Sequence, residues 1–210
     1  LIYAKSPFSV TQIDGLKKSG RVLIAYEPTY PPPGLSVASV KVALFLPGYF
    51  EKRTGTAKAE KNFFVVVSRH GIKWPTRELA AVLVHELVGH GGQHKEDRLD
   101  LMRFGDKECE AWLYEEMAYR HFGMDRLSRE MINFQKQLSQ QCGAFVEYMR
   151  RIDPEGLARW EVLNRDTPKV LVHFNRYLDD LRARGILSAA LKKQSARQDE
   201  AREQLFRDGP

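Results

Sequence analysis

Residues 79–94 read LAAVLVHELVGHGGQH, and this stretch decides the fold that the sequence predicts. Its first six residues are apolar on every face, which is typical of a buried helix. The apolar run leads directly into His85 and Glu86, and His90 and His94 follow within the same window. A buried histidine–glutamate pair is costly unless a partner satisfies both side chains. A metal ion would do so, and the stretch therefore predicts a metal site on a buried helix.

The spacing of His85 and His90 differs from that of a regular metal-binding helix. Histidines four apart lie on one face of an α-helix and can share an ion, whereas residues five apart lie roughly 140° apart. A single π-turn absorbs one extra residue and realigns the two faces. Alternatively, the helix ends near Gly89, and a turn through Gly91 and Gly92 brings His90 back, because glycine tolerates unusual dihedral angles. We therefore expect a break in regular helical hydrogen bonding between His85 and His90.

The stretch from His85 to His90 resembles the H-E-L-G-H form of the zinc-binding helix in zincin metallopeptidases, with Val88 inserted. The resemblance is confined to this helix and one downstream segment. It implies that His85 and His90 bind zinc and that Glu86 acts as the general base on a water molecule. The third histidine of the metzincin branch is absent, because Glu96 occupies its position.

In the thermolysin-like branch of the zincins, the gluzincins, a glutamate on a following helix supplies the third ligand. Residues 105–123 predict such a helix, with Asp106 as its N-cap and Gly123 as its end. Glu110 follows His90 by 20 positions, a separation similar to that in thermolysin-like enzymes. Two histidines, a glutamate and a water would make the tetrahedral site with an open position that catalytic zinc needs.

The helical wheel favours Glu110 over Glu108 as this third ligand. Glu110 lies on a mostly apolar face, so we expect it to point inward. Glu108 lies on the face of Glu115, and we expect Glu115 and Glu116 to be solvated. Glu108 is therefore kept as the alternate.

A competing metal site would pair His90 with His94, because residues four apart share one helical face. Asp97 or Asp100 would complete that ligand set. The two glycines between these histidines weaken the helix, at about 1 kcal/mol each relative to alanine. A purely structural cluster, in which hydrogen bonds satisfy the buried histidines, is the third interpretation.

The resemblance implies hydrolysis of peptide bonds by a water that zinc activates and that Glu86 deprotonates. A substrate peptide could lie antiparallel along an exposed sheet edge, most simply the predicted strand at residues 63–67. A further donor should stabilise the oxyanion. The candidate donors are His173, Tyr177, His121 and Tyr114. Of these, His173 and Tyr177 lie four residues apart on one predicted helix and so face the same way.

The order of the predicted elements indicates an α+β fold. Residues 1–75 read mainly as strands and loops, with strands at 21–26, 39–46 and 62–68 and a hairpin loop over 54–61. Residues 76–185 read mainly as helices, including a long one over 130–151 and one capped by Thr167. Because zincins have the same order, we expect one zincin-like catalytic domain over 1–185. A basic helical tail is expected over 186–210.

Composition places the chain among globular proteins, since 43% of its residues are hydrophobic and 29% are charged. No apolar run is long enough to span a bilayer, and no signal peptide is visible. Because the chain begins with Leu1, we expect either a soluble cytoplasmic protein or an exported one whose leader has been removed. Cys109 and Cys142 both fall in predicted helices, so two free thiols are expected.

The net charge of +6 and the pI of about 9.3 raise the question of nucleic-acid binding. Acidic residues intersperse most of the basic clusters, and no recognised nucleic-acid-binding motif appears. The expected partner is therefore a peptide or protein substrate. Two alternatives are kept. One is a degenerate zincin that acts as a binding or scaffold module, and the other is a basic helical interaction or nucleic-acid-binding protein without metal.

Overall fold

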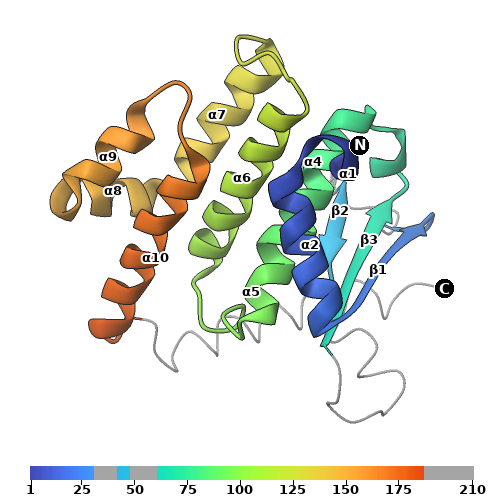
Figure 1. Ribbon diagram of the computed structural model, residues 1–210, viewed down its shortest axis with the longest axis horizontal. Coiled ribbons are helices and arrows are strands. Elements are labelled where there is room, and N and C mark those ends of the chain that lie inside the picture. The colour runs from blue at the N-terminus through green and yellow to red at the C-terminus, as the bar shows by residue number, and fades with distance from the viewer. Residues whose placement is uncertain (31–41, 48–60, 187–210) are drawn as a thin grey trace.

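The computed structural model describes residues 1–30, 42–47 and 61–186 and sets a three-stranded sheet beside a larger body of helices (Figure 1). This architecture confirms the predicted α+β class. The predicted tail at 187–210, the loop at 54–60 and residues 39–41 of the second predicted strand lie outside the described residues.

The chain begins with two helices where the sequence predicted strands and loops: α1 (Ile2–Lys5) and α2 (Pro7–Ser19). Pro7 opens α2 at a position where its missing N–H costs nothing. Ile13 and Leu16, three residues apart, are buried and face the body of the protein. The prediction for the first 19 residues was therefore wrong, because this short helix carries only a narrow apolar stripe.

The sheet consists of β1 (Gly20–Glu27), β2 (Ala43–Phe45) and β3 (Lys61–Ser68), in the order β1-β3-β2. β3 lies in the middle, parallel to β1 and antiparallel to β2. The prediction that a substrate peptide could pair with residues 63–67 is therefore wrong, because β1 and β2 already occupy both edges of this strand. Among the described strands, β2 is the edge strand on the side of the helices that follow.

The helical half begins after a single turn, η2 (Gly71–Lys73), and includes the segments that carry the predicted site: α4 (Thr76–Val84), η3 (His85–His90), α5 (Gly91–Lys95) and α6 (Phe104–His121). The chain continues through α7 (Arg129–Gln141), α8 (Gly143–Ile152), α9 (Pro154–Glu161) and α10 (Thr167–Ala183). Figure 1 shows α4 and α5 between the sheet and α6, with α7 to α10 on the far side of α6.

Several predicted helix boundaries need correction. The helix predicted over 130–151 is two helices, because the chain breaks at Cys142. Asp166, rather than Thr167, caps α10 by accepting a hydrogen bond from the backbone of Lys169. Asp106 lies inside α6 and pairs with Arg103.

The predicted end of α6 at Gly123 is confirmed, since this residue has a φ of +71°, which favours glycine.

The apolar core joins the sheet to the helices. One face of the sheet presents Phe45, Phe63 and Val65 to a cluster that includes Val84 and Leu87. This packing buries the whole segment from His85 to His90, as the apolar stretch before it predicted. Within the described part of the chain, no helix combines the length and the apolar character that crossing a bilayer requires.

Candidate metal centre

The segment η3 is a π-helix that spans His85–His90, between two stretches of ordinary α-helix. A π-helix forms hydrogen bonds between residues five apart, so side chains five apart come to lie on the same face. The imidazole rings of His85 and His90 accordingly lie with their centroids 5.0 Å apart. The predicted break in α-helical hydrogen bonding is confirmed, and it takes the form of the π-turn.

A close approach of two backbones brings α6 to this segment. A Cβ atom built on Gly89 would lie 2.6 Å from the Cβ atom and 2.7 Å from the Cα atom of Ala111. Real Cβ atoms do not come this close, so only glycine permits the contact. The short distance between the two helices allows Glu108, one turn before Ala111, to reach both histidines.

The three side chains His85, His90 and Glu108 converge on one point. The Nε2 atom of His85 lies 3.5 Å from one carboxylate oxygen of Glu108, and the Nε2 atom of His90 lies 3.6 Å from the other. One ligand atom from each residue can be chosen so that all lie within 4.8 Å of one another. Two imidazole nitrogens and a carboxylate oxygen are a donor set that catalytic zinc sites use, so these residues fit the ion that the resemblance implies.

Glu110, the residue predicted from the sequence as third ligand, does not join this group. It points inward as expected and is only 2% exposed. However, both of its carboxylate oxygens accept hydrogen bonds at 2.9 Å from Arg98, and one also accepts from Gln93. Its burial is thus explained by an ion pair, and the glutamate beside the histidines is the alternate, Glu108.

The competing ligand set is also not brought together. His94 lies between the rings of Phe45 and Phe63. The carboxylate of Asp97 accepts a hydrogen bond from Lys61 at 2.7 Å. His94, Asp97 and Asp100 all lie outside the group of possible ligands found among the described residues.

Each histidine is held from behind through its Nδ1 atom. The Nδ1 atom of His85 lies 3.0 Å from a carboxylate oxygen of Glu115, and that of His90 lies 3.0 Å from the side-chain oxygen of Gln93. The Nε2 atoms of both rings therefore face Glu108. A metal-binding histidine typically makes such a bond with its other nitrogen, which fixes the orientation of the ring.

The burial of two glutamates of α6 was not predicted from the sequence. Glu115 was expected to be solvated, but it is 6% exposed and lies on the same face of α6 as Glu108. Its position seven residues after Glu108 is a signal that could have identified it. Glu116, also expected in solvent, is fully buried and pairs with Arg165 and Arg126.

The surroundings shift the pKa values of the two histidines in opposite directions. Burial favours the neutral form of both rings. At His85 the hydrogen bonds with Glu108 and Glu115 outweigh burial and raise the pKa well above its ordinary value. At His90 burial prevails and lowers the pKa. Three carboxylates, those of Glu86, Glu108 and Glu115, thus surround two imidazoles in a largely buried space, and a cation there would offset their negative charge.

Glu86 lies beside the same space and is fixed by the sheet. One of its carboxylate oxygens accepts a hydrogen bond of 2.8 Å from the backbone N–H of Phe45 in β2. Glu86, His85, His90 and Glu108 all line a cleft of roughly 730 Å³. The cleft runs along the edge of β2, so an extended chain could lie beside both the sheet edge and the three converging side chains.

One wall of the cleft is aromatic. The rings of Trp112 and Phe134 stack with centroids 4.9 Å apart, and Trp112 lies edge-on to His85. Tyr119 also lines the cleft, and burial together with the neighbouring Glu115 raises the pKa of its phenol. This wall gives an apolar surface next to the candidate ligands.

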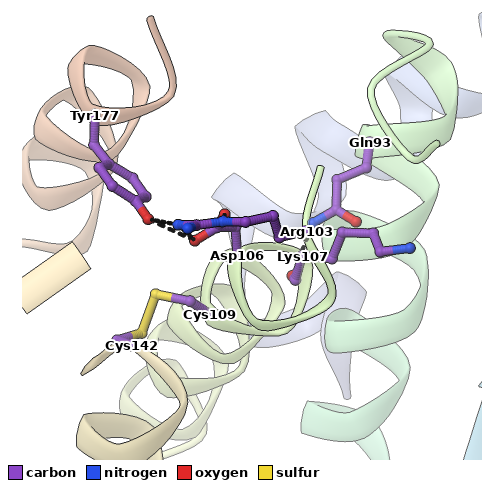
Figure 2. The surroundings of a disulfide bond; sticks show 7 residues. All are labelled: Gln93, Arg103, Asp106, Lys107, Cys109, Cys142 and Tyr177. Carbon is purple, nitrogen blue, oxygen red and sulfur yellow. Dashed lines mark hydrogen bonds and ion pairs between the residues drawn. A yellow bond between two sulfur atoms is a disulfide. The ribbon is translucent and has the colours of Figure 1, made fainter. Parts of the chain in front are cut away.

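The four side chains predicted as oxyanion donors are engaged elsewhere. Tyr177 donates a hydrogen bond to Asp106, in the surroundings of the disulfide (Figure 2), and His173 binds Asp153. The other two contact the N-terminal segment: His121 binds the hydroxyl of Ser6, between α1 and α2, and Tyr114 stacks on Phe8 of α2. Among the described residues that line the cleft, none of these four side chains occurs.

Cys109 and Cys142 form a disulfide, which joins the start of α6 to the junction between α7 and α8 (Figure 2). The prediction of two free thiols was therefore wrong. It assumed that Cys142 lay within a long helix, whereas the chain turns there and directs the side chain toward α6. Cys109 follows Glu108 directly in the sequence. The disulfide therefore anchors the end of α6 that carries the candidate ligand.

Comparison of the chain with models of protein families, with curated proteins and with solved structures finds no match.

Proposed function

We propose that this protein is a zinc-dependent metallopeptidase in which His85, His90 and Glu108 hold the ion. The observation that carries the proposal is the π-turn, because it places two histidines five residues apart on one face, opposite a glutamate from a following helix. Zinc in such a site would polarise the scissile carbonyl and lower the pKa of a water molecule toward ~7.

Glu86 is proposed as the general base. Its carboxylate lines the cleft beside the two histidines and would accept a proton from the attacking water and donate it to the leaving amine. The backbone N–H of Phe45 in β2 binds one carboxylate oxygen of Glu86. This bond to the sheet fixes the orientation of the carboxylate. Preorganisation of this kind lowers the cost of reaching the reactive geometry.

The proposed substrate is an extended peptide beside β2. In the antiparallel pairing with β3, the backbone groups of Val42 and Leu46 point toward β3, and those of Phe45 point toward the cleft. Because the N–H of Phe45 already donates to Glu86, an added strand would bind through the other backbone groups on this side of β2, and alternate side chains would enter the cleft. The aromatic wall around Trp112 and Phe134 would then favour an apolar side chain next to the scissile bond.

The proposed location is an oxidising compartment. The sequence left both a cytoplasmic and an exported protein open. Disulfides persist in exported proteins and are rare in the cytosol of most organisms, so the bond between Cys109 and Cys142 favours export.

The proposal is tested with Glu86→Gln. We expect protein purified without added metal to contain about one zinc per chain, and chelation to lower its melting temperature. Glu86→Gln should keep the zinc but lose hydrolysis of unfolded protein substrates, because an amide cannot accept the proton. The matched control is Glu161→Gln, since Glu161 is exposed and lies outside this cleft. Absence of a transition metal, or unchanged activity in Glu86→Gln, would refute the proposal.

A further inference from the structure

A row of buried polar side chains lies behind His90, on the side away from Glu108. The Nδ1 atom of His90 lies 3.0 Å from the side-chain oxygen of Gln93. The amide nitrogen of Gln93 in turn donates to Glu110 at 3.0 Å and to the backbone carbonyl of Lys107 at 2.9 Å. Gln93 is fully buried, and Glu110 is 2% exposed. Such a row is costly unless every member is satisfied, so its arrangement is informative.

The contacts of Gln93 determine which way its amide points. A side-chain amide nitrogen carries two protons and accepts nothing. Both protons have acceptors here, the carboxylate of Glu110 and the carbonyl of Lys107, next to which Figure 2 shows the amide. The reversed orientation would place the amide oxygen against two acceptors. The oxygen of Gln93 is therefore the atom that faces His90.

This orientation specifies the position of the proton on His90. The oxygen of Gln93 can only accept, so the Nδ1 atom of His90 must be the donor. In a neutral imidazole with a proton on Nδ1, the lone pair lies on Nε2. That atom faces a carboxylate oxygen of Glu108 at 3.6 Å, on the side where the three candidate ligands converge.

Arg98 holds the far end of the row. Its guanidinium donates two hydrogen bonds of 2.9 Å to the two oxygens of Glu110 and a third, of 2.6 Å, to Glu96. A forked pair of this kind fixes the plane of the carboxylate as well as its charge. The carboxylate of Glu110 is thereby presented to Gln93 as an acceptor in one orientation.

We propose that Gln93, held by Glu110 and Arg98, is a positioning residue that fixes His90 as the tautomer protonated on Nδ1, so that its Nε2 atom is available to bind a metal. The use of Nε2 as a ligand rests on the proposed function. The tautomer itself is a property of the metal-free protein and can be measured there. Glu110 thus acts on the site indirectly, because it orients Gln93, which in turn orients His90.

The test replaces Gln93 with methionine, which has a similar length but cannot accept from Nδ1. The nitrogen-15 shifts of the imidazoles are measured in metal-free protein at a pH where His90 is neutral. We expect wild-type His90 to be protonated on Nδ1 and Gln93→Met to lose this preference. The matched control is Gln140→Met, on the exposed surface of α7, which should leave the His90 signals unchanged.

A second readout is affinity for zinc, measured by competition with a chelator. Loss of a residue that orients a metal-binding histidine typically weakens metal binding about 10- to 100-fold, and we expect Gln93→Met to fall in this range. If that variant does not fold, Glu110→Gln replaces it. The substitution turns the carboxylate that accepts from both Arg98 and Gln93 into an amide, and so disturbs the contact that orients Gln93. This variant should also reduce the population of His90 protonated on Nδ1.

The outcomes separate this inference from the proposed function. A wild-type tautomer of His90 in folded Gln93→Met, or in Glu110→Gln where the first variant does not fold, overturns the positioning role. Wild-type protein that has the expected tautomer but binds no zinc leaves the positioning role standing and refutes the metallopeptidase proposal.

Discussion

Gly89 lies so close to Ala111 that a Cβ atom built on Gly89 would be 2.6 Å from the Cβ atom of Ala111, and this close approach sets the distance between η3 and α6. The same two elements carry the candidate ligands, His85 and His90 on the first and Glu108 on the second. A change in their separation would therefore move the carboxylate relative to both imidazoles. The absence of a side chain at position 89 is thus a requirement of the site as well as of the packing.

We expect Gly89→Ala to destabilise the protein and to weaken zinc binding. The added methyl group would overlap the backbone of Ala111, which cannot move aside as a flexible side chain can. Overpacking of this kind costs about 1 to 3 kcal/mol, and displacement of α6 would draw Glu108 away from the histidines. Urea unfolding and a zinc titration measure the two effects.

The control for this prediction is Gly92→Ala. A Cβ atom at position 92 would meet nothing within 4 Å, and the residue lies in α5. Alanine is favoured over glycine in a helix by about 1 kcal/mol, so this variant should be as stable as the wild type or slightly more stable. Equal stability and equal zinc affinity in both variants would contradict the role assigned to Gly89.

Glu108→Ala and Glu110→Ala should fail in different ways. Glu108 lines the cleft, so its removal should abolish tight zinc binding and leave the metal-free protein folded. Removal of Glu110 would leave Arg98, whose side chain is only 13% exposed, with the largely exposed Glu96 as its remaining ion-pair partner. Breaking a buried ion pair costs about 3 to 5 kcal/mol, and urea unfolding of the metal-free proteins should show this difference.

A double variant checks the cause of that loss. Glu110→Ala combined with Arg98→Met also removes the charge that has lost its buried partner and should recover part of the lost stability. Wild-type zinc affinity in Glu108→Ala would exclude Glu108 as a ligand. A Glu110→Ala variant as stable as the wild type would show that Glu96 is a sufficient partner for Arg98.

The extent to which the site could be predicted depends on how local its determinants are. The apolar run before His85 indicated a buried helix, and the five-residue spacing to His90 indicated the break that the π-turn provides. Both features lie within one stretch of sequence. The choice between Glu108 and Glu110 cannot be made from that stretch, because it depends on Arg98, which lies in the connection between α5 and α6. A helical wheel cannot distinguish a carboxylate buried against an arginine from one buried near a metal site.

The same limit explains the other corrections. The helix that carries His173 and Tyr177 was predicted, and both residues are buried on it. Their partners are Asp153, which lies between α8 and α9, and Asp106 of α6, and the sequence alone did not indicate these contacts. The disulfide was missed because the break at Cys142 is set by the packing of α7 and α8 against the core, and it is not marked by proline.

Removal of the disulfide should destabilise the protein. The bond closes a loop with a sequence separation of 33 residues, and cross-links of this size typically contribute about 2 to 4 kcal/mol. We expect Cys109→Ala combined with Cys142→Ala to lose stability in this range. Thiol alkylation under denaturing conditions should modify no cysteine without reductant and both cysteines after reduction. Two modified thiols in the unreduced protein would contradict the bond.

Asp153 should make a contribution to stability that disappears in acid. Its carboxylate caps α9 by accepting from the N–H of Gly156 and also binds His173, 2.7 Å away. Burial alone would raise the pKa of Asp153, but these two hydrogen bonds and the nearby charge of Arg176 lower it below the ordinary value of 3.8. A carboxyl group with a lowered pKa in the folded state stabilises the protein above its ordinary pKa, and this contribution is lost as the pH falls through the lowered value.

We therefore expect Asp153→Ala to cost about 1 to 2 kcal/mol near neutral pH, as the loss of a helix cap does. The difference from the wild type should shrink as the pH falls below 3.8, because the wild-type carboxyl group then becomes protonated while the variant has no such group to protonate. The matched control is Asp179→Ala, since the side chain of Asp179 is 71% exposed in its pair with Arg182 and such pairs contribute little. Urea unfolding at a series of pH values measures both variants. A cost for Asp153→Ala that stays constant into acid would show that the charge of Asp153 does not contribute to its stabilising role.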